Sequence, residues 1–118
     1  MKLLTKEIRA KLIANGQLQK PLRGTPQEID FRPVVKLFNP CGAATWLLTE
    51  VMPEDDDIAF GLCDLGMQCP EIGSVRISEL EAYRGPLMLG IERDLHFTAD
   101  KTLLEYAREA RAAGCIVA

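Results

Sequence analysis

Residues 3–14 carry apolar side chains at three- and four-residue spacing, with charged side chains at most of the positions between them. This spacing is typical of an amphipathic helix that buries one stripe of its surface. Thr5 is suited to cap its start, because a threonine hydroxyl can accept a bond from a free backbone N–H. Asn15 and Gly16 both tolerate left-handed backbone, which commonly closes a helix. We therefore expect a helix over residues 6–14.

Residues 34–78 alternate short apolar runs with turn signals. Runs of this length, rich in β-branched and large apolar residues, are typical of strands. The turn signals are Asn-Pro-Cys-Gly at 39–42 and an acidic stretch at 53–57. Because short turns join neighbouring runs, the pattern favours an antiparallel meander. The expected strands cover residues 34–40, 44–51, 58–66 and 74–78.

The last third of the chain predicts two more helices. Ser78 followed by Glu81 fits a capping box, in which a serine hydroxyl and a glutamate three residues later satisfy free N–H groups. Thr98 or Asp100 is a candidate cap for the final helix, and Gly114 closes it. The predicted helices cover residues 79–84 and 101–113, and LHFT at 95–98 is a candidate for the last strand.

Together these elements predict the α+β fold class. A chain of 118 residues is close to the commonest size of a single domain, so we expect one domain over residues 1–118. The expected architecture is a four- to five-stranded, mainly antiparallel sheet, with the N-terminal, short middle and C-terminal helices packed on one face. Residues 17–33 contain three prolines without clear periodicity and are expected to form a loop-like insertion.

The composition indicates a globular protein, with 47% hydrophobic and 26% charged residues. No apolar run approaches the roughly 20 residues that cross a membrane, and charges interrupt the N-terminal segment, so neither a membrane span nor a signal peptide is expected. We therefore expect a cytoplasmic protein. The net charge of −3 gives nucleic-acid binding no help, although the basic residues of the predicted loop, Lys20, Arg23 and Arg32, keep that function as an alternative.

The residue types that bind metals lack a suitable spacing. Cys63 and Cys69 are six residues apart, unlike the C-x-x-C pairs of zinc sites. The only histidine, His96, lies between two apolar residues, which favours a structural role over catalysis. The acidic stretch at 54–57 lacks the alternating ligands of a calcium loop. We expect four free thiols, no metal site and no cofactor.

Glu92, Arg93 and Asp94 follow one another inside the mostly apolar stretch RGPLMLGIERDLHF at residues 84–97. On an extended segment alternate side chains point to opposite faces, so both carboxylates share one side and Arg93 takes the other. Charges on a buried face must be paired. Candidate partners for the carboxylates are Arg84, Arg76 and Lys36, and those for Arg93 are Glu50, Glu71, Glu79 and Asp64.

This charged cluster has two interpretations. An ion-pair network that fixes the segment to the sheet is the favoured one, because buried charges need partners whatever the function. The alternative is a functional site in which two carboxylates on one face perform acid–base chemistry or bind a ligand. The candidate site residues are Glu92, Arg93, Asp94, Arg84, Glu50 and Glu71.

Six segments carry a resemblance to a known family: LLTKEIRAKL, VVKLFNP, TWLLTE, FGLCDLG, PEIGSVRISELE and RGPLMLGIERDLHF. They lie in this order and cover most of residues 3–97, and on them the chain resembles the bacterial domain of unknown function family 2958. Residues 17–33 resemble it least, and Met88 stands where the family pattern suggests a glycine. The resemblance implies a small cytosolic protein carried on plasmids, phages and integrated mobile elements, with no established activity and no catalytic residues to carry over.

Three functions remain open from the sequence. The first is a non-enzymatic accessory protein that binds another protein, favoured because the sequence has neither a catalytic constellation nor a strong basic charge. The second is a small enzyme or ligand-binding domain that uses the carboxylate–arginine cluster. The third is a nucleic-acid-binding protein that uses the basic loop residues with the N-terminal helix. An open cleft around residues 92–94 would favour the second, and closed ion pairs there the first.

Overall fold

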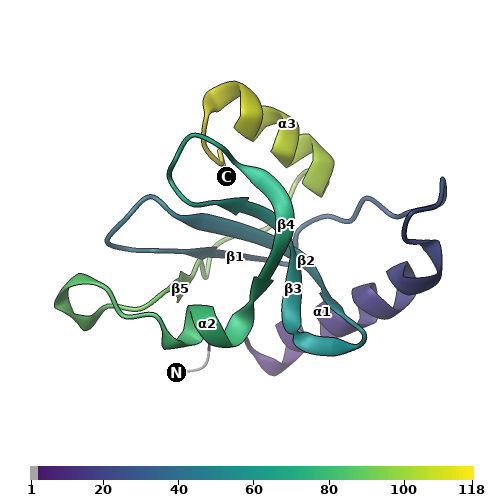
Figure 1. Cartoon of the computed structure of the whole chain (residues 1–118), viewed down its shortest axis with the longest axis horizontal. Helices are drawn as coiled ribbons and strands as arrows, with labels where there is room; N and C mark the ends of the chain where they lie inside the picture. Colours follow the sequence, from purple (N-terminus) through teal and green to yellow (C-terminus); the bar gives the residue numbers. More distant parts are fainter. Residues whose placement is uncertain (1–2) are drawn as a thin grey trace.

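The computed structural model describes residues 3–118 and shows one five-stranded antiparallel sheet with three α-helices (Figure 1). The strand order is β4-β3-β2-β1-β5, so strands joined by short turns lie side by side as a meander. This architecture confirms the predicted α+β class. The helices are α1 (Lys6–Gln19), α2 (Ile77–Ala82) and α3 (Leu103–Ala113), the strands are β1 (Val35–Phe38), β2 (Thr45–Met52), β3 (Asp55–Asp64), β4 (Glu71–Arg76) and β5 (Glu92–Arg93), and the 3₁₀ turns are η1 (Lys20–Leu22) and η2 (Pro86–Met88).

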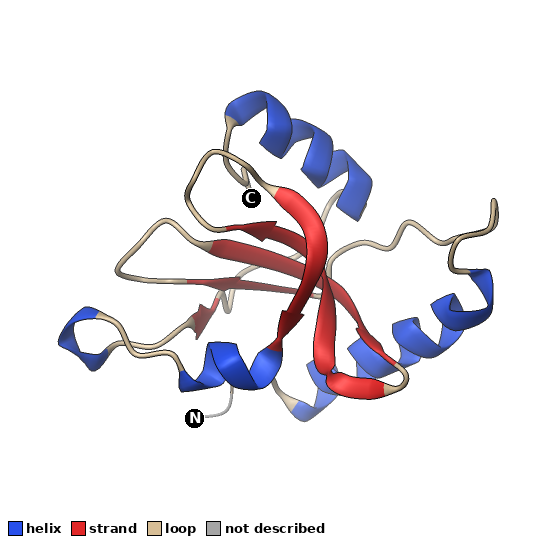
Figure 2. Ribbon diagram, in the orientation of Figure 1, coloured by secondary structure: helices blue, strands red, loops and turns tan. Residues whose placement is uncertain are grey.

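The helices cover both faces of the sheet, so the expectation of helices on one face was wrong. On one face, Leu12 of α1 and Ile77 of α2 pack in a cluster with Leu48 of β2. On the other face, Leu103 of α3 packs in a second cluster with Leu47 of β2. Both leucines of β2 are fully buried, because consecutive strand residues point to opposite faces and each face is covered. Figure 2 shows α1 and α3 at separate positions against the strands.

The first helix begins where Thr5 predicts but continues past Ala14 to Gln19. The Thr5 hydroxyl accepts a 3.1 Å bond from the Ile8 N–H, as a capping residue does. The helix does not stop at Asn15 because the Asn15 amide donates a 2.9 Å bond to the Thr49 carbonyl of β2. Gly16 lies so close to the backbone of Val51 that a Cβ there would overlap it. Packing against β2 therefore overrides the local stop signal.

The two later helices begin at residues other than those expected. Thr102, with Glu105 three residues on, forms the capping box of α3, so this helix starts two residues after the predicted position. Gly114 closes it in left-handed backbone, as expected. For α2 the capping residue is Arg76 and the helix begins at Ile77, because the side chain and N–H of Ser78 both donate to Asp57 instead of capping the helix.

Strand bounds differ most at the acidic stretch and at the sheet edge. β3 begins at Asp55, so the acidic stretch lies largely within the strand, where Arg76 of β4 contacts the carboxylates of Asp55 and Asp57 at 3.2 and 3.5 Å. The fifth strand is β5 rather than LHFT, and it pairs with β1 through Leu37 opposite Arg93. The remaining strand bounds agree with the expected ones to within three residues.

The segment expected to be a loop-like insertion bridges two helices. It starts as the end of α1 and as η1, passes through turns at residues 23–27, and reaches the start of α3. The Gln19 amide donates a 2.7 Å bond to the Ile29 carbonyl and accepts a 2.9 Å bond from the Ile29 N–H. At the start of α3, the N–H groups of Leu103 and Leu104 donate to the Phe31 carbonyl at 2.8 Å and to the Asp30 carboxylate at 3.1 Å. The segment is thus anchored at both ends.

Candidate functional site at a strand bulge

The centre of the candidate site is an irregularity in β2. Leu48 lies opposite Gly61 of β3 and Glu50 opposite Phe60, so Thr49 is an extra residue in β2. Such a bulge changes the alternation of side chains. Leu48 and Val51, three residues apart, both pack in the cluster beside α1, and Glu50 is turned to the face covered by α3. The bulge therefore directs a carboxylate toward the interior of the α3 face.

Gly61 makes this bulge possible. A Cβ at position 61 would overlap the carbonyl of Leu47 and approach the Cα of Leu48 to 2.8 Å. A Cβ added at Gly73, which lies opposite Gly61 on β4, would meet nothing within 4 Å. Of these two glycines, Gly61 is therefore the one where the neighbouring backbone comes too close for a side chain. Only glycine fits at this position.

Glu50 is buried and paired with one arginine. Its side chain is 2% exposed, and Arg23 Nη2 lies 2.6 Å from its Oε2. The Thr49 hydroxyl lies 3.2 Å from Glu50 Oε1 and also from the Phe60 carbonyl, so its single proton serves one acceptor at a time. Burial raises the pKa of the Glu50 carboxyl above its ordinary value, although Arg23 and Thr49 act in the opposite direction.

Arg23 contacts the site with both its charge and its flat face. The guanidinium carbon lies 5.3 Å from the centre of the Phe60 ring, a cation–π arrangement, while Nη2 binds Glu50. The Arg23 side chain remains 35% exposed. One end of the ion pair is therefore in solvent and the other is in the protein interior.

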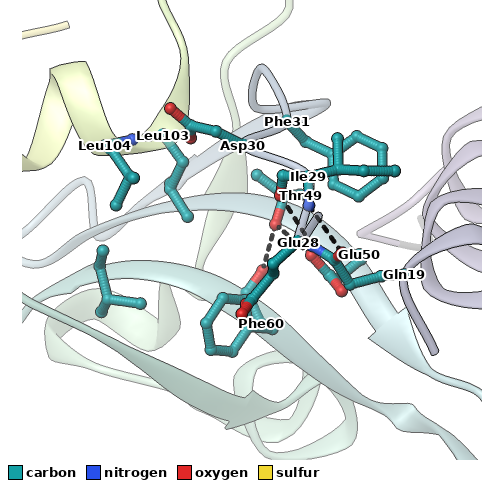
Figure 3. Close-up of a pocket in the computed structure, with 11 residues that line it drawn as sticks. Gln19, Glu28, Ile29, Asp30, Phe31, Thr49, Glu50, Phe60, Leu103 and Leu104 are labelled. Atoms are coloured by element: carbon teal, nitrogen blue, oxygen red, sulfur yellow. Dashed lines mark hydrogen bonds between the residues drawn. The ribbon is translucent and has the colours of Figure 1, made fainter. Parts of the chain in front are cut away.

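A pocket of about 170 Å³ opens beside Glu50 (Figure 3). It lies between β2, β3, the anchored segment at residues 28–31 and the start of α3. Its walls are mostly apolar, and three carboxylates lie among its lining residues. The apolar walls are Ile29, Phe31, Phe60, Ile72, Leu103 and Leu104, and the carboxylates belong to Glu28, Asp30 and Glu50.

The charged cluster predicted from the sequence is divided in the structure. Arg93 donates from Nη1 to the Leu3 carbonyl at 2.6 Å, and not to a carboxylate. Arg84 donates to the carbonyls of Glu81 and Tyr83, at 2.8 and 2.6 Å, so it pairs with neither carboxylate of the tripeptide in residues 3–118. Arg84, Glu92 and Arg93 nevertheless line one shared pocket of about 240 Å³.

The other predicted site residues lie elsewhere. Asp94 pairs with Lys36 at 3.5 Å, and the N–H of His96, which lies 2.9 Å away, is the main cause that lowers the pKa of Asp94. Glu71 is exposed at the start of the edge strand β4. The six candidates therefore occupy separate places: one pocket holds Arg84, Glu92 and Arg93, the bulge holds Glu50, and Asp94 and Glu71 stand apart.

The basic residues considered for nucleic-acid binding are partly engaged. Lys20 lies 3.3 Å from Glu54, and Arg23 forms the ion pair with Glu50. Arg32 is exposed. Two of the three cations therefore already have a carboxylate partner, which weakens their attraction for phosphate.

Other reactive groups add little chemistry in residues 3–118. The four cysteines are free thiols, and burial raises the pKa of the Cys63 thiol, which disfavours the reactive thiolate. No group of three or more metal-ligating side chains is arranged around one point in this range. None of the helices described has the length and apolar character to cross a membrane.

Sequence reasoning selected Glu50 but missed the residues that make it a site. Arg23 was considered only for nucleic acid, and Thr49, Asp30 and Phe60 were not among the candidate site residues. One signal was available: apolar residues at 46, 48 and 51 break the alternation expected of a strand, which indicates a bulge between 48 and 51.

Comparison with known proteins gives a family but no activity. The family described as "Protein of unknown function (DUF2958)" matches residues 3–117, nearly the whole chain. No curated protein and no solved structure matches. The match agrees with the resemblance seen in the six sequence segments, and on this basis the chain belongs to the DUF2958 family.

Proposed function

We propose that the protein is a non-enzymatic, cytosolic accessory protein of a mobile genetic element that binds a partner protein through residues 83–89. The family resemblance supports the genetic context, and the composition supports the location. The proposal of protein binding rests on one structural observation, the exposed apolar side chains of this projecting segment.

The projecting segment leaves the body of the molecule between α2 and β5. Figure 2 shows it ending in the short helix at the far left, away from the sheet. Bonds from the Gly85 N–H to the Leu89 carbonyl, at 2.8 Å, and from the Met88 N–H to the Gly85 carbonyl, at 3.0 Å, close the segment into a compact loop. The segment is therefore a defined knob rather than an extended connection.

Leu87 and Met88 form the tip of this knob. They are 88% and 75% exposed, the two largest exposed fractions among the large hydrophobic residues of the described chain. Both have left-handed backbone, with φ of 60° and 61°. For residues other than glycine, this conformation costs on the order of 1–2 kcal/mol each. Strained backbone that also exposes apolar side chains favours a binding function, because neither feature stabilises the isolated protein.

The chemistry of the knob indicates the kind of partner. Two long apolar side chains side by side fit an apolar groove, and methionine adapts to irregular surfaces. Arg84 and Glu92, which line the pocket beside the knob, supply one charge of each sign for a polar rim. The expected partner is therefore a protein whose surface has an apolar groove bordered by polar groups.

Affinity capture in the native host tests this proposal. The double variant Leu87→Asp/Met88→Asp is compared with the matched control Leu65→Asp/Met67→Asp, which changes a second exposed apolar pair, 58% and 69% exposed. We expect the wild-type protein and the control to retain the same stoichiometric partner and the knob variant to lose it. Retention by the knob variant, equal loss in both variants, or no stoichiometric partner would contradict the proposal.

A further inference from the structure

The geometry points to a second site: the pocket beside Glu50 binds a cationic head group, an ammonium or guanidinium, carried on a short apolar stem. This inference is independent of the proposed protein-binding knob, since the pocket lies between β2, β3 and α3 while the knob lies between α2 and β5. It rests on the charges of the pocket, on the shape and character of its walls, and on the contacts of Arg23.

The charges lining the pocket have one sign. Glu28, Asp30 and Glu50 contribute carboxylates, and among residues 3–118 no lysine, arginine or histidine lines the pocket. In residues 3–118, Glu28 and Asp30 take part in no salt bridge, and Glu50 has Arg23 alone. A cation that enters the pocket therefore meets two carboxylates without an ion-pair partner, those of the exposed Glu28 and Asp30, beside the buried carboxylate of Glu50, which Arg23 already pairs.

The walls select a ligand that is apolar behind its charged head. Phe31, Phe60 and Leu103 are among the six apolar residues that surround the carboxylates. The volume of about 170 Å³ is close to the ~150 Å³ cavity that holds benzene, so the pocket accommodates a stem of about four carbon atoms. A fully hydrated ion, such as a metal cation with its waters, fits less well, because its water molecules would lie against these apolar walls.

Arg23 shows the recognition chemistry within the protein itself. Its guanidinium binds Glu50 at 2.6 Å and lies over the ring of Phe60, so the same two residues already hold a cation on an aliphatic stem. Arg23 binds Oε2 of Glu50 and is not among the residues that line the pocket. A ligand in the pocket would meet Glu50 with Asp30 and Glu28 as further acceptors.

The walls of the pocket are held in place before any ligand binds. The reciprocal bonds of Gln19 with Ile29 fix one end of the segment at residues 28–31, and the bonds of Asp30 and Phe31 to the start of α3 fix the other. A preformed pocket requires little ordering when the ligand binds, which favours affinity for a small molecule.

NMR titration of the ¹⁵N-labelled protein at low salt tests the inference. n-Butylammonium is the probe, and n-butanol and butyrate, of matched stem length, are the controls. We expect saturable shifts with n-butylammonium that centre on the amides of residues 28–31, 49–50, 60 and 103–104. Equal shifts with n-butanol, shifts centred elsewhere, or no saturable shift below about 50 mM would overturn the inference.

Variants test whether the Glu50 carboxylate itself binds n-butylammonium or only supports the fold. Glu50→Gln should weaken n-butylammonium binding at least tenfold, and Glu71→Gln, which removes an exposed carboxylate outside the pocket, should leave it unchanged. Leu104→Trp places bulk at the pocket from a half-exposed position, so it should block binding even if Glu50→Gln fails to fold. Unchanged binding in a folded Leu104→Trp variant would contradict the pocket assignment.

The same head group occurs in free amines and in the side chains of lysine and arginine. A third arm therefore compares n-butylammonium with Nα-acetyl-lysine N-methylamide and with a pentapeptide that has one central lysine. Equal affinities for the three probes identify a free amine as the ligand class. A peptide that binds at least tenfold more tightly identifies a side chain of another polypeptide.

Discussion

Arg23 and Glu50 form an ion pair of 2.6 Å in which the carboxylate is buried and the guanidinium is one-third exposed. Because Glu50 lies at the bulge of β2 and Arg23 directly follows η1, the pair connects the sheet to the segment after α1. Removal of one member of a buried pair leaves the other without compensation. The pair is therefore both an anchor for the segment and the electrostatic centre of the pocket.

Arg23→Ala should destabilise the protein by about 1–3 kcal/mol at pH 7. The lower part of this range applies because Arg23 is partly exposed and its charge is screened by solvent. The double variant Arg23→Ala/Glu50→Gln should recover part of the loss, since it leaves no unpaired buried charge. Urea denaturation of the wild type, both single variants and the double variant measures the coupling, and additive effects would show that the pair is not coupled.

Glu50 should make the wild-type protein less stable as pH rises. Burial raises its pKa in the folded state above the ordinary value near 4.5, so the folded protein binds this proton more tightly than the unfolded chain does. The stabilisation that this tighter proton binding provides is complete below pH 4.5. It is lost as the pH rises through the raised pKa of Glu50 in the folded protein. The free energy of unfolding of the wild type relative to Glu50→Gln should therefore fall between pH 4.5 and 7. A difference that is constant or rises with pH would contradict the assignment.

Gly61→Ala should destabilise the protein by about 1–3 kcal/mol, since a methyl group there meets the backbone of β2 and forces the two strands apart. Gly73→Ala is the matched control, because the same change on the neighbouring strand meets nothing within 4 Å. The control should be within about 0.5 kcal/mol of the wild type or slightly more stable. Thermal and urea denaturation compare the two, and equal effects would show that the close approach at the bulge is absent.

Leu87→Gly should stabilise the isolated protein by about 0.5–1 kcal/mol, although most substitutions by glycine do the opposite. The left-handed backbone at Leu87 is strained for leucine and relaxed for glycine, and relief of the strain outweighs the greater entropy of the unfolded chain. Leu65→Gly changes another exposed leucine whose backbone is not left-handed, and should destabilise by about 0.5–1 kcal/mol. Destabilisation by both changes would show that the knob is not strained.

Local signals in the sequence were reliable where local physics decides the structure. Thr5 caps α1 and Gly114 closes α3 because capping depends on residues next to one another in the chain. The short turns also gave the antiparallel meander and hence the α+β class. Each of these features is determined within a few residues, without contacts from distant segments.

Local sequence signals failed where contacts with distant segments determine the structure. The helix continues through Asn15 and Gly16 because β2 lies against them, and a stop signal on its own cannot show this neighbour. Glu50 and its arginine are 27 residues apart and meet only through the bulge. Arg93 was expected to pair with a carboxylate, but its partner is the carbonyl of Leu3. Of the cations proposed for the two carboxylates, Lys36 does pair with Asp94.

Site-specific photo-crosslinking tests whether residues 83–89 contact a partner protein. A photoreactive amino acid replaces Leu87 in one variant and Leu65, in the loop between β3 and β4, in the other, and both variants are irradiated in the native host. We expect one discrete adduct with a different protein from position 87 and none above background from position 65. Equal adducts from both positions, no adduct from position 87, or an adduct with a second copy of this chain would contradict this expectation.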